Sequence, residues 1–161
     1  MAITDIARKL SISYATCNKA LTWLRGHELA TETKVGKQKL ISLEIDKWTI
    51  WKKALPFMYS PVERVLYTDA EVRYLSGYNA LAEYSHLAHT DEDVRAWYGR
   101  VPPHFTKEEN KTKVEVWRYS PALLSDTTVV DPLSLYLILK DDEDERVSME
   151  LDYMLHQVLD K

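Results

Sequence analysis

The sequence predicts an α+β fold in two parts, and three observations lead to this prediction. Near the N-terminus, apolar residues recur every three or four positions, which is the spacing of helices that pack on a core. Directly after them, two strand-like runs flank Gly36, a pattern typical of a hairpin. Beyond a proline-containing stretch, strand-like and helix-like segments are mixed, which indicates a second part that is itself α+β.

The composition is that of a folded chain with room for one domain or two small ones. Of the 161 residues, 45% are hydrophobic and only four are glycine, which argues against disorder. No run approaches the roughly 20 apolar residues that span a bilayer, and the N-terminus lacks a secretory signal pattern. A lone cysteine, Cys17, is typical of a reducing compartment. We therefore expect a cytoplasmic protein with no membrane partner.

The net charge of -4 conceals an asymmetry between the two parts. Residues 1–53 hold ten Lys and Arg against five Asp and Glu, an excess of +5, whereas residues 54–161 hold eleven against twenty, an excess of -9. Such an asymmetry favours a polyanion-binding N-terminal part and an acidic remainder. The competing interpretation, that the basic excess is only a solvated face, is about equally compatible with the charge alone.

Two helices are expected before the hairpin. The first covers residues 3–10, with Thr4 as its N-cap. Ser13 is expected to cap the second helix, because a serine oxygen can accept a backbone N–H at a helix start. Gly26 is expected to end this helix in the left-handed conformation that glycine adopts readily. The inward stripe of the second helix consists of Cys17, Ala20, Leu21 and Leu24.

The hairpin completes the first domain. Residues 29–35 and 37–43 are expected to pair around a turn at Gly36. Two helices, a tight turn and a hairpin together make a winged helix-turn-helix. A further helix is expected from Glu44 to about Lys53, with Pro56 at its end.

The stretch PFMYSP is the natural linker between two domains. We predict a winged-helix domain over residues 1–55 and a mixed α/β domain, with an effector or dimerisation role, over residues 61–161. Asp131 and Pro132 are expected to start a helix, since aspartate is favoured as N-cap and proline in the first turn. The other expected elements of this domain are strands over residues 62–69, 94–101 and 113–120 and helices over residues 76–89 and 146–159.

Residues 3–43 resemble the winged helix-turn-helix of bacterial transcriptional regulators of the MarR-like kind. The resemblance rests on the stretch ITDIARKLSISYATCNKALTWLRGHELA and on the hairpin TETKVGKQKLISL. It implies sequence-specific binding of double-stranded DNA, with the second helix in the major groove and the hairpin, or wing, on the backbone. The residues expected to contact DNA are Ser13, Tyr14, Thr16, Asn18, Lys19, Thr22, Arg25, Lys34, Lys37 and Lys39.

These residues are expected to play different roles. Asn18 can pair with two atoms of an adenine edge, and Tyr14 can contact a thymine methyl group or a phosphate. Lys19 and Arg25 are expected to contact phosphates, because they mainly supply charge. The three wing lysines are expected to straddle the backbone or to enter the minor groove.

Two features depart from MarR-like proteins, which carry a helix before this motif and long terminal helices that form their dimer. This chain starts on the motif and continues as mixed α/β, so their dimer and ligand pocket are not expected here. Winged helices also act as protein-interaction or RNA modules. A protein-interaction module therefore remains the alternative function.

Residues 61–160 resemble the effector half of AbiEi-type antitoxins, which are winged-helix proteins of abortive-infection toxin–antitoxin systems. The resemblance rests on the GYNAL segment (Gly77 to Leu81), on VDPLSLYL (Val130 to Leu137) and on the charged loop before the helix that follows Asp144. It implies an autorepressor that antagonises a nucleotidyltransferase-like toxin. The candidate partners are therefore duplex DNA, such a toxin, and a second copy of the chain in a homodimer.

An enzyme that processes nucleic acids is the least favoured alternative, and no catalytic residue, metal or cofactor is expected. The groups considered are His86, His89, Asp91 and Asp93 for a metal and Asp69, Glu71, Glu115 and Asp131 for a nuclease-like cluster. Histidines at a helix end more often cap carbonyls. The cluster lacks a Glu-x-Lys partner, because Val116 and Trp117 follow Glu115. The acidic run Asp141 to Glu145 lacks the ligand spacing and glycine of a calcium loop.

Overall fold

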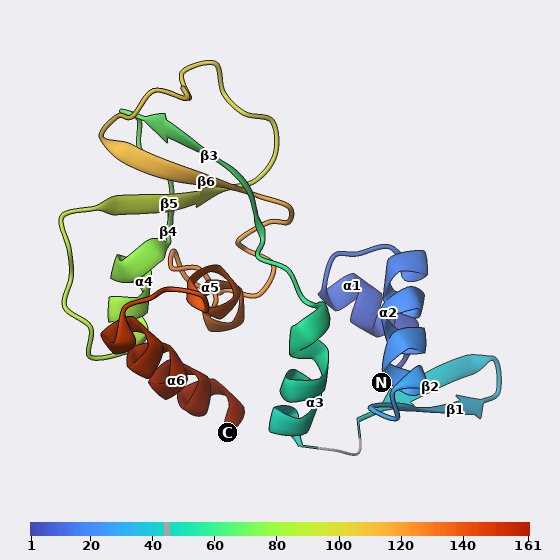
Figure 1. Ribbon diagram of the computed structural model, residues 1–161. Coiled ribbons are helices and arrows are strands. Elements are labelled where there is room, and N and C mark those ends of the chain that lie inside the picture. The colour runs from blue at the N-terminus through green and yellow to red at the C-terminus, as the bar shows by residue number, and fades with distance from the viewer. Residues whose placement is uncertain (44–45) are drawn as a thin grey trace. The chain divides into compact units, whose positions relative to one another are not determined.

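A computed structural model describes residues 1–43 and 46–161, and the chain divides into two compact units, Met1–Phe57 and Met58–Lys161 (Figure 1). The described residues form six α-helices and two sheets, so the predicted α+β class is confirmed. Each unit has a hydrophobic core of its own residues.

The first unit opens with helices α1 (Ile3–Lys9) and α2 (Tyr14–Gly26). Ser13 caps α2 as predicted, with its Oγ accepting the N–H of Thr16 at 3.0 Å. The prediction of Thr4 as the cap of α1 is wrong, because helical bonding already starts at the carbonyl of Ala2, which accepts the N–H groups of Asp5 and Ile6. Thr4 therefore lies inside the first turn.

The end of α2 also differs from the prediction. Gly26 belongs to the helix, and Glu28 instead takes the left-handed conformation, with φ of 58°. The N–H of Glu28 bonds to the carbonyl of Arg25, and that of Leu29 bonds to the carbonyl of Leu24, which is the hydrogen-bond pattern of a Schellman motif. Because Leu29 is almost fully buried, its packing fixes which residue must adopt the left-handed turn.

The core of the first unit lies where α1, α2 and the hairpin meet. Its buried residues are Ile3, Ala7, Cys17, Leu21, Ala30 and Ile41, with Ile12 and Leu24 packed at the edge. Ala20 is exposed, so its place in the predicted inward stripe is wrong. The short helix α1 covers only part of the apolar face of α2, along Cys17 and Leu21, and leaves Ala20 outside.

The hairpin consists of antiparallel strands β1 (Thr31–Val35) and β2 (Gln38–Ser42), shorter than predicted. Gly36, with φ of 62°, occupies the turn as expected. Leu29 and Ala30 are buried before the strand starts, which shortens β1. Ala2 adds an isolated antiparallel bridge to Leu40, so the N-terminus pairs with the outer edge of β2.

Helix α3 (Lys47–Ala54) begins at the N-cap Asp46, whose carboxylate accepts the N–H of Thr49 at 3.0 Å. Of the helix predicted here, residues 44 and 45 lie outside the described part of the chain. A short 3-10 turn, Leu55–Phe57, follows α3 and contains Pro56.

The second unit is built on a four-stranded sheet in the order β3-β6-β5-β4. Its strands are β3 (Val62–Thr68), β4 (Tyr74–Leu75), β5 (Asp93–Trp97) and β6 (Thr112–Trp117). Strands β5 and β6 are parallel, and the other neighbours are antiparallel. Strand β4, which is only two residues long, was not predicted. The three longer strands fall where the sequence predicts them, with ends that differ by up to four residues.

Helices α4 (Gly77–Tyr84), α5 (Pro132–Leu139) and α6 (Glu145–Leu159) gather beside this sheet (Figure 1). Their core includes Leu81, Leu135 and Leu151, with Trp117 from β6. Side chains alternate along β6, so Val114 and Val116 point to the opposite face, where Phe105 covers them. The sheet is therefore covered on both faces, by helices on one and by loop residues on the other.

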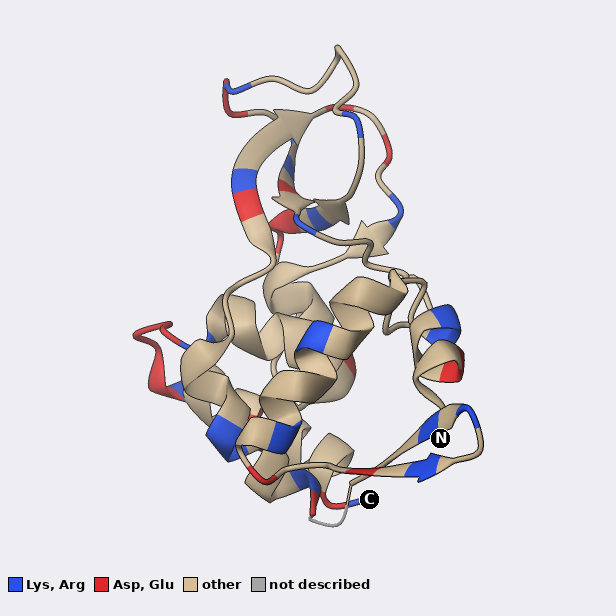
Figure 2. Ribbon diagram, turned by 90° about the vertical axis from the view of Figure 1, so that its right-hand side faces the viewer, with Lys and Arg blue, Asp and Glu red and all other residues tan. Residues whose placement is uncertain are grey.

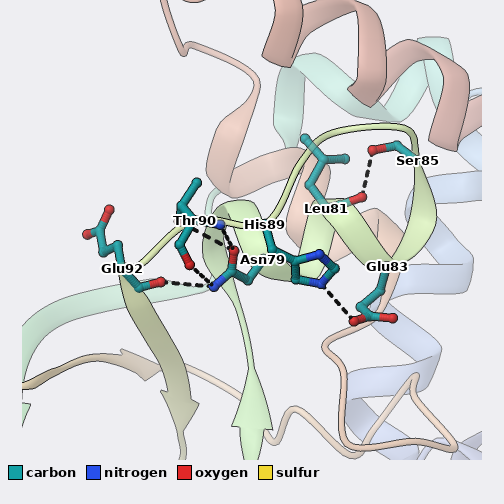
Figure 3. Close-up of polar contacts among 7 residues, drawn as sticks. All are labelled: Asn79, Leu81, Glu83, Ser85, His89, Thr90 and Glu92. Atoms are coloured by element: carbon teal, nitrogen blue, oxygen red, sulfur yellow. Dashed lines mark hydrogen bonds and ion pairs between the residues drawn. The ribbon is translucent and has the colours of Figure 1, made fainter.

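Helix α5 begins as predicted, with Asp131 as N-cap and Pro132 in the first turn. Helix α4 ends at Tyr84, short of the predicted residue 89. The following loop is held by Asn79, whose amide nitrogen donates to the carbonyls of Thr90 and Glu92 and whose oxygen accepts the N–H of Thr90 at 2.7 Å (Figure 3). These bonds draw residues 85–92 back across the start of α4 and prevent further helix.

Candidate nucleic-acid interface

The first turn of α2 and the turn end of the hairpin share one hollow. Tyr14 from α2 and Lys37, Gln38 and Lys39 from the hairpin line it, together with residues 2–4, around a volume of about 150 Å³. Tyr14 is 49% exposed, and both lysines are exposed. Residues that are 23 or more positions apart in the sequence are thus brought onto one polar surface of the first unit.

The outward side of α2 carries most of the residues predicted to contact DNA. Ser13, Tyr14, Thr16, Lys19 and Thr22 are exposed, and Asn18 is half-buried. Two of these hydroxyl groups already bond to each other, because the Ser13 Oγ donates to the Thr16 Oγ1 at 2.8 Å. Ser13 and Thr16 therefore serve first as the cap of the helix, which leaves Tyr14, Asn18 and Lys19 as the outward groups of its first half.

The second half of α2 is connected to the hairpin. Arg25 forms an ion pair with Glu32 on β1, and the Nζ of Lys39 on β2 lies 3.6 Å from the same carboxylate. The guanidinium of Arg25 also donates to the Thr22 Oγ1 at 3.1 Å, and that hydroxyl donates to the carbonyl of Asn18 at 2.7 Å. Three predicted DNA contacts, at positions 22, 25 and 39, are thus joined in one network.

Glu32 is the residue of this surface that sequence reasoning missed. A signal for it exists, because it is the only acidic residue in a hairpin that carries three lysines. The register explains its position: Glu32 lies opposite Ile41, and Lys34 lies opposite Lys39, so all four share one face of the hairpin. Two lysines placed directly opposite each other repel, and the carboxylate beside them offsets that repulsion.

Basic positions occur on both strands of the hairpin and at its turn (Figure 2), and they are Lys34, Lys37 and Lys39. Lys34 and Lys37 are exposed there, at the end away from the core. The first unit as a whole has ten Lys and Arg against five Asp and Glu. The surface that α2 and the hairpin form is therefore cationic and rich in hydrogen-bond donors, which suits a phosphate backbone.

The histidines considered as metal ligands have other partners. The Nε2 of His89 lies 3.1 Å from a carboxylate oxygen of Glu83 (Figure 3), and the Nδ1 of His86 lies 3.7 Å from a carboxylate oxygen of Glu150. Asp93 accepts a hydrogen bond from the Nε of Arg95. In residues 1–43 and 46–161, no three His, Cys, Asp or Glu side chains come together in a way that could hold a metal ion.

The four carboxylates considered as a nuclease-like cluster lie in different surroundings. Asp69 and Glu71 line a hollow of about 660 Å³ with a mixed set of acidic and basic residues. Asp131 caps α5 by accepting the N–H of Ser134 at 2.8 Å. Glu115 is only 5% exposed and accepts hydrogen bonds from Ser76 at 2.5 Å and Trp117 at 3.3 Å. Burial raises the pKa of this buried carboxyl.

The acidic run before α6 has structural partners. Tyr78 donates its hydroxyl to Asp142, and this bond, with burial, raises the pKa of Tyr78 to about 12. The same bond lowers the pKa of Asp142. Asp144 caps α6 by accepting the N–H of Arg146 at 2.9 Å. Two acids of the run thus fix where α6 begins and how its loop meets α4.

Comparison with protein-family models, with curated proteins and with solved structures finds no match for this chain. Among the helices of the described residues, none combines the length and the apolar character that crossing a membrane requires. The first unit carries the surface on which a helix start and a lysine-rich hairpin open together.

Proposed function

We propose that the first unit is a winged helix-turn-helix that binds duplex DNA, with α2 as recognition helix and the β1–β2 hairpin as wing. The observation that carries the proposal is the shared hollow, in which Tyr14 of α2 meets Lys37 and Lys39 of the hairpin. A helix start and a cationic hairpin that open onto the same surface can engage one duplex at once.

The helix supplies the sequence reading in this proposal. The major groove of B-DNA admits an α-helix, and residues near the helix start reach the base edges. Tyr14, Asn18 and Lys19 lie on the outward side of the first half of α2. Asn18 has the amide that pairs with adenine, while the lysine supplies charge for a phosphate.

The hairpin supplies affinity that does not depend on sequence. Lys34 and Lys37 are exposed near its turn, where they can meet phosphates on either side of a groove. Arg25, which the sequence suggested as an independent phosphate contact, is paired with Glu32 and holds the hairpin on α2. Its first role in this proposal is therefore to fix the angle of the wing.

We propose further that the chain is a sequence-specific transcriptional regulator of the autorepressor, antitoxin type, acting by steric repression without chemistry on the DNA. The second unit carries eleven Lys and Arg against twenty Asp and Glu, so its charge disfavours a phosphate backbone. In this proposal the second unit forms a dimer or contacts a toxin partner.

The experiment is fluorescence anisotropy of the full chain with duplex DNA from the region upstream of its own gene, against a random duplex of equal length and composition. Wild type is expected to prefer the upstream duplex. Asn18→Ala should lose about 1–3 kcal/mol of this preference, the range of a bidentate base contact. Lys37→Ala should weaken binding to both duplexes and lower the salt slope by about 0.9.

The matched control for the wing variant is Lys53→Ala, which removes the same charge from α3 instead of the hairpin. It should leave the salt slope nearly at the wild-type value. If wild type binds no duplex even at low salt, the proposal is wrong, and the winged helix acts as a protein-interaction module.

A further inference from the structure

We propose that Glu32 is an internal competitor for DNA phosphate: in the free protein its carboxylate occupies Arg25 and Lys39, and this lowers the affinity of the surface for the phosphate backbone of DNA. The inference rests on the proposed function, since it assigns a role in setting the affinity of the same surface for phosphate. It adds an acidic residue to a surface whose charged contacts in the proposed function are all basic.

The first support is the way the three side chains share the surface. The carboxylate of Glu32 contacts both cations, yet its side chain is only 16% exposed, whereas those of Arg25 and Lys39 are 32% and 47% exposed. The acid therefore lies beneath the two cations, which still face solvent. A phosphate that approaches from outside meets groups that are already oriented and already partly neutralised.

The second support is the chemistry of the site. A guanidinium binds carboxylate and phosphate oxygens through the same planar fork, so one anion can replace the other. The guanidinium of Arg25 is also held by Thr22 at 3.1 Å. Its position is thus fixed from two sides, and exchange of the anion does not require the arginine to search for a new conformation.

The consequence for binding follows from the role of phosphate contacts. Contacts to phosphates supply essentially all the affinity for random DNA, whereas base contacts add to the affinity for the correct site. An internal anion weakens the phosphate contacts of every duplex equally. Because both affinities fall by the same factor, their ratio is unchanged, but a random duplex, which lacks the base contacts of α2, is left with the lower absolute affinity.

A purely structural role for Glu32 makes a different prediction. If the ion pair only holds the hairpin on α2, its removal loosens the wing and weakens binding to every duplex. If the carboxylate competes with phosphate, its removal strengthens binding to random DNA and steepens the dependence on salt, because Arg25 and Lys39 then release additional counterions.

The test compares Glu32→Gln with Glu28→Gln in the full chain, using a labelled random-sequence duplex. The control changes the net charge equally, but Glu28 lies in the turn between α2 and β1. At about 50 mM salt we expect Glu32→Gln to bind the random duplex about fivefold more tightly than the control. The ratio of affinities at about 50 and 200 mM salt should increase about threefold over the control, which corresponds to one additional phosphate contact.

Equal behaviour of the two variants, or weaker binding by Glu32→Gln, would overturn the inference while leaving the proposed function intact. Failure of wild type to bind any duplex would overturn both. Circular dichroism melting shows whether Glu32→Gln folds. If it does not fold, Glu32→Thr, with a side chain suited to a strand, provides the same loss of charge and the same two readouts.

Discussion

Glu32 in the first unit and Glu115 in the second are both strand residues whose carboxylates make two contacts, but their surroundings differ. Glu32 lies between two cations at a cationic surface. Glu115 is enclosed by the core and accepts bonds from the neutral donors Ser76 and Trp117. Exposed cations can exchange such a carboxylate for another anion, whereas an enclosed carboxylate mainly fixes the position of its neighbours.

Gly36 in the first unit and Gly77 in the second differ in how much free space surrounds them. A Cβ on Gly36 would meet no atom within 4 Å, whereas a Cβ on Gly77 would lie 2.9 Å from the Cβ of Val94. Both residues have positive φ. The turn of the hairpin in the first unit thus has free space around it, whereas the start of α4 in the second unit is tightly packed against Val94.

The largest expected effect is that of Gly77→Ala, which combines the left-handed conformation with a steric clash against Val94. We expect the free energy of unfolding of the second unit to fall by about 3 kcal/mol. Gly36→Ala has only the strain of the left-handed conformation and should lose about 1 kcal/mol in the first unit. Urea unfolding, monitored in each unit by amide hydrogen exchange, measures both losses of unfolding free energy. Equal losses in the two variants would contradict the comparison.

The next effect concerns Glu115 and depends on pH. Burial raises the pKa of its carboxyl above the ordinary glutamate value of 4.5, so the folded state binds this proton more tightly than the unfolded state. The contribution of this group to stability is therefore greatest below pH 4.5 and falls as the pH rises through the folded pKa.

Glu115→Gln keeps an acceptor for Ser76 and Trp117 but removes the buried charge. We expect it to stabilise the second unit by about 1 kcal/mol at pH 7 and to have little effect at acid pH. Thermal melting at a series of pH values checks this. A loss of stability at neutral pH would show that the charged carboxylate is required.

A similar effect is expected for Tyr78→Phe, which removes the bond to Asp142 but keeps the ring. The loss should be about 1 kcal/mol of unfolding free energy, since Tyr78 is only half-buried. The lowered pKa of Asp142 contributes stability above pH 3.8, and this contribution is lost as the pH falls through the folded pKa. The difference between wild type and variant should therefore become smaller in acid melting experiments, because a protonated carboxyl accepts this bond less strongly.

The smallest effect on stability is expected for Glu32→Gln. Its cationic partners are partly exposed, and such ion pairs contribute about 0–1 kcal/mol. We expect the unfolding free energy of the first unit to change by less than about 1 kcal/mol, measured by thermal melting. A loss as large as that of Gly77→Ala would place Glu32 with Glu115, as a residue that mainly holds the fold.

Much of the fold could be predicted because its signals are local. Ser13 and Asp131 cap helices through bonds to residues three positions away, and Pro132 and Gly36 act through their own backbone angles. The predictions at Thr4, Gly26 and Ala20 failed where packing decided. The burial of Leu29 and the short reach of α1 are not visible in the residues that flank those positions.

The sequence by itself determined that this chain is α+β, that its N-terminal part is basic and its remainder acidic, and that Tyr14 and Lys19 face outward from α2. Only the tertiary structure decided that Arg25 and Lys39 share the carboxylate of Glu32, and that Ser76 donates to Glu115. Each of these contacts joins different elements, so it depends on how those elements pack and on the strand register. Local sequence signals fix caps and turns, whereas the choice of a distant charge partner follows from packing.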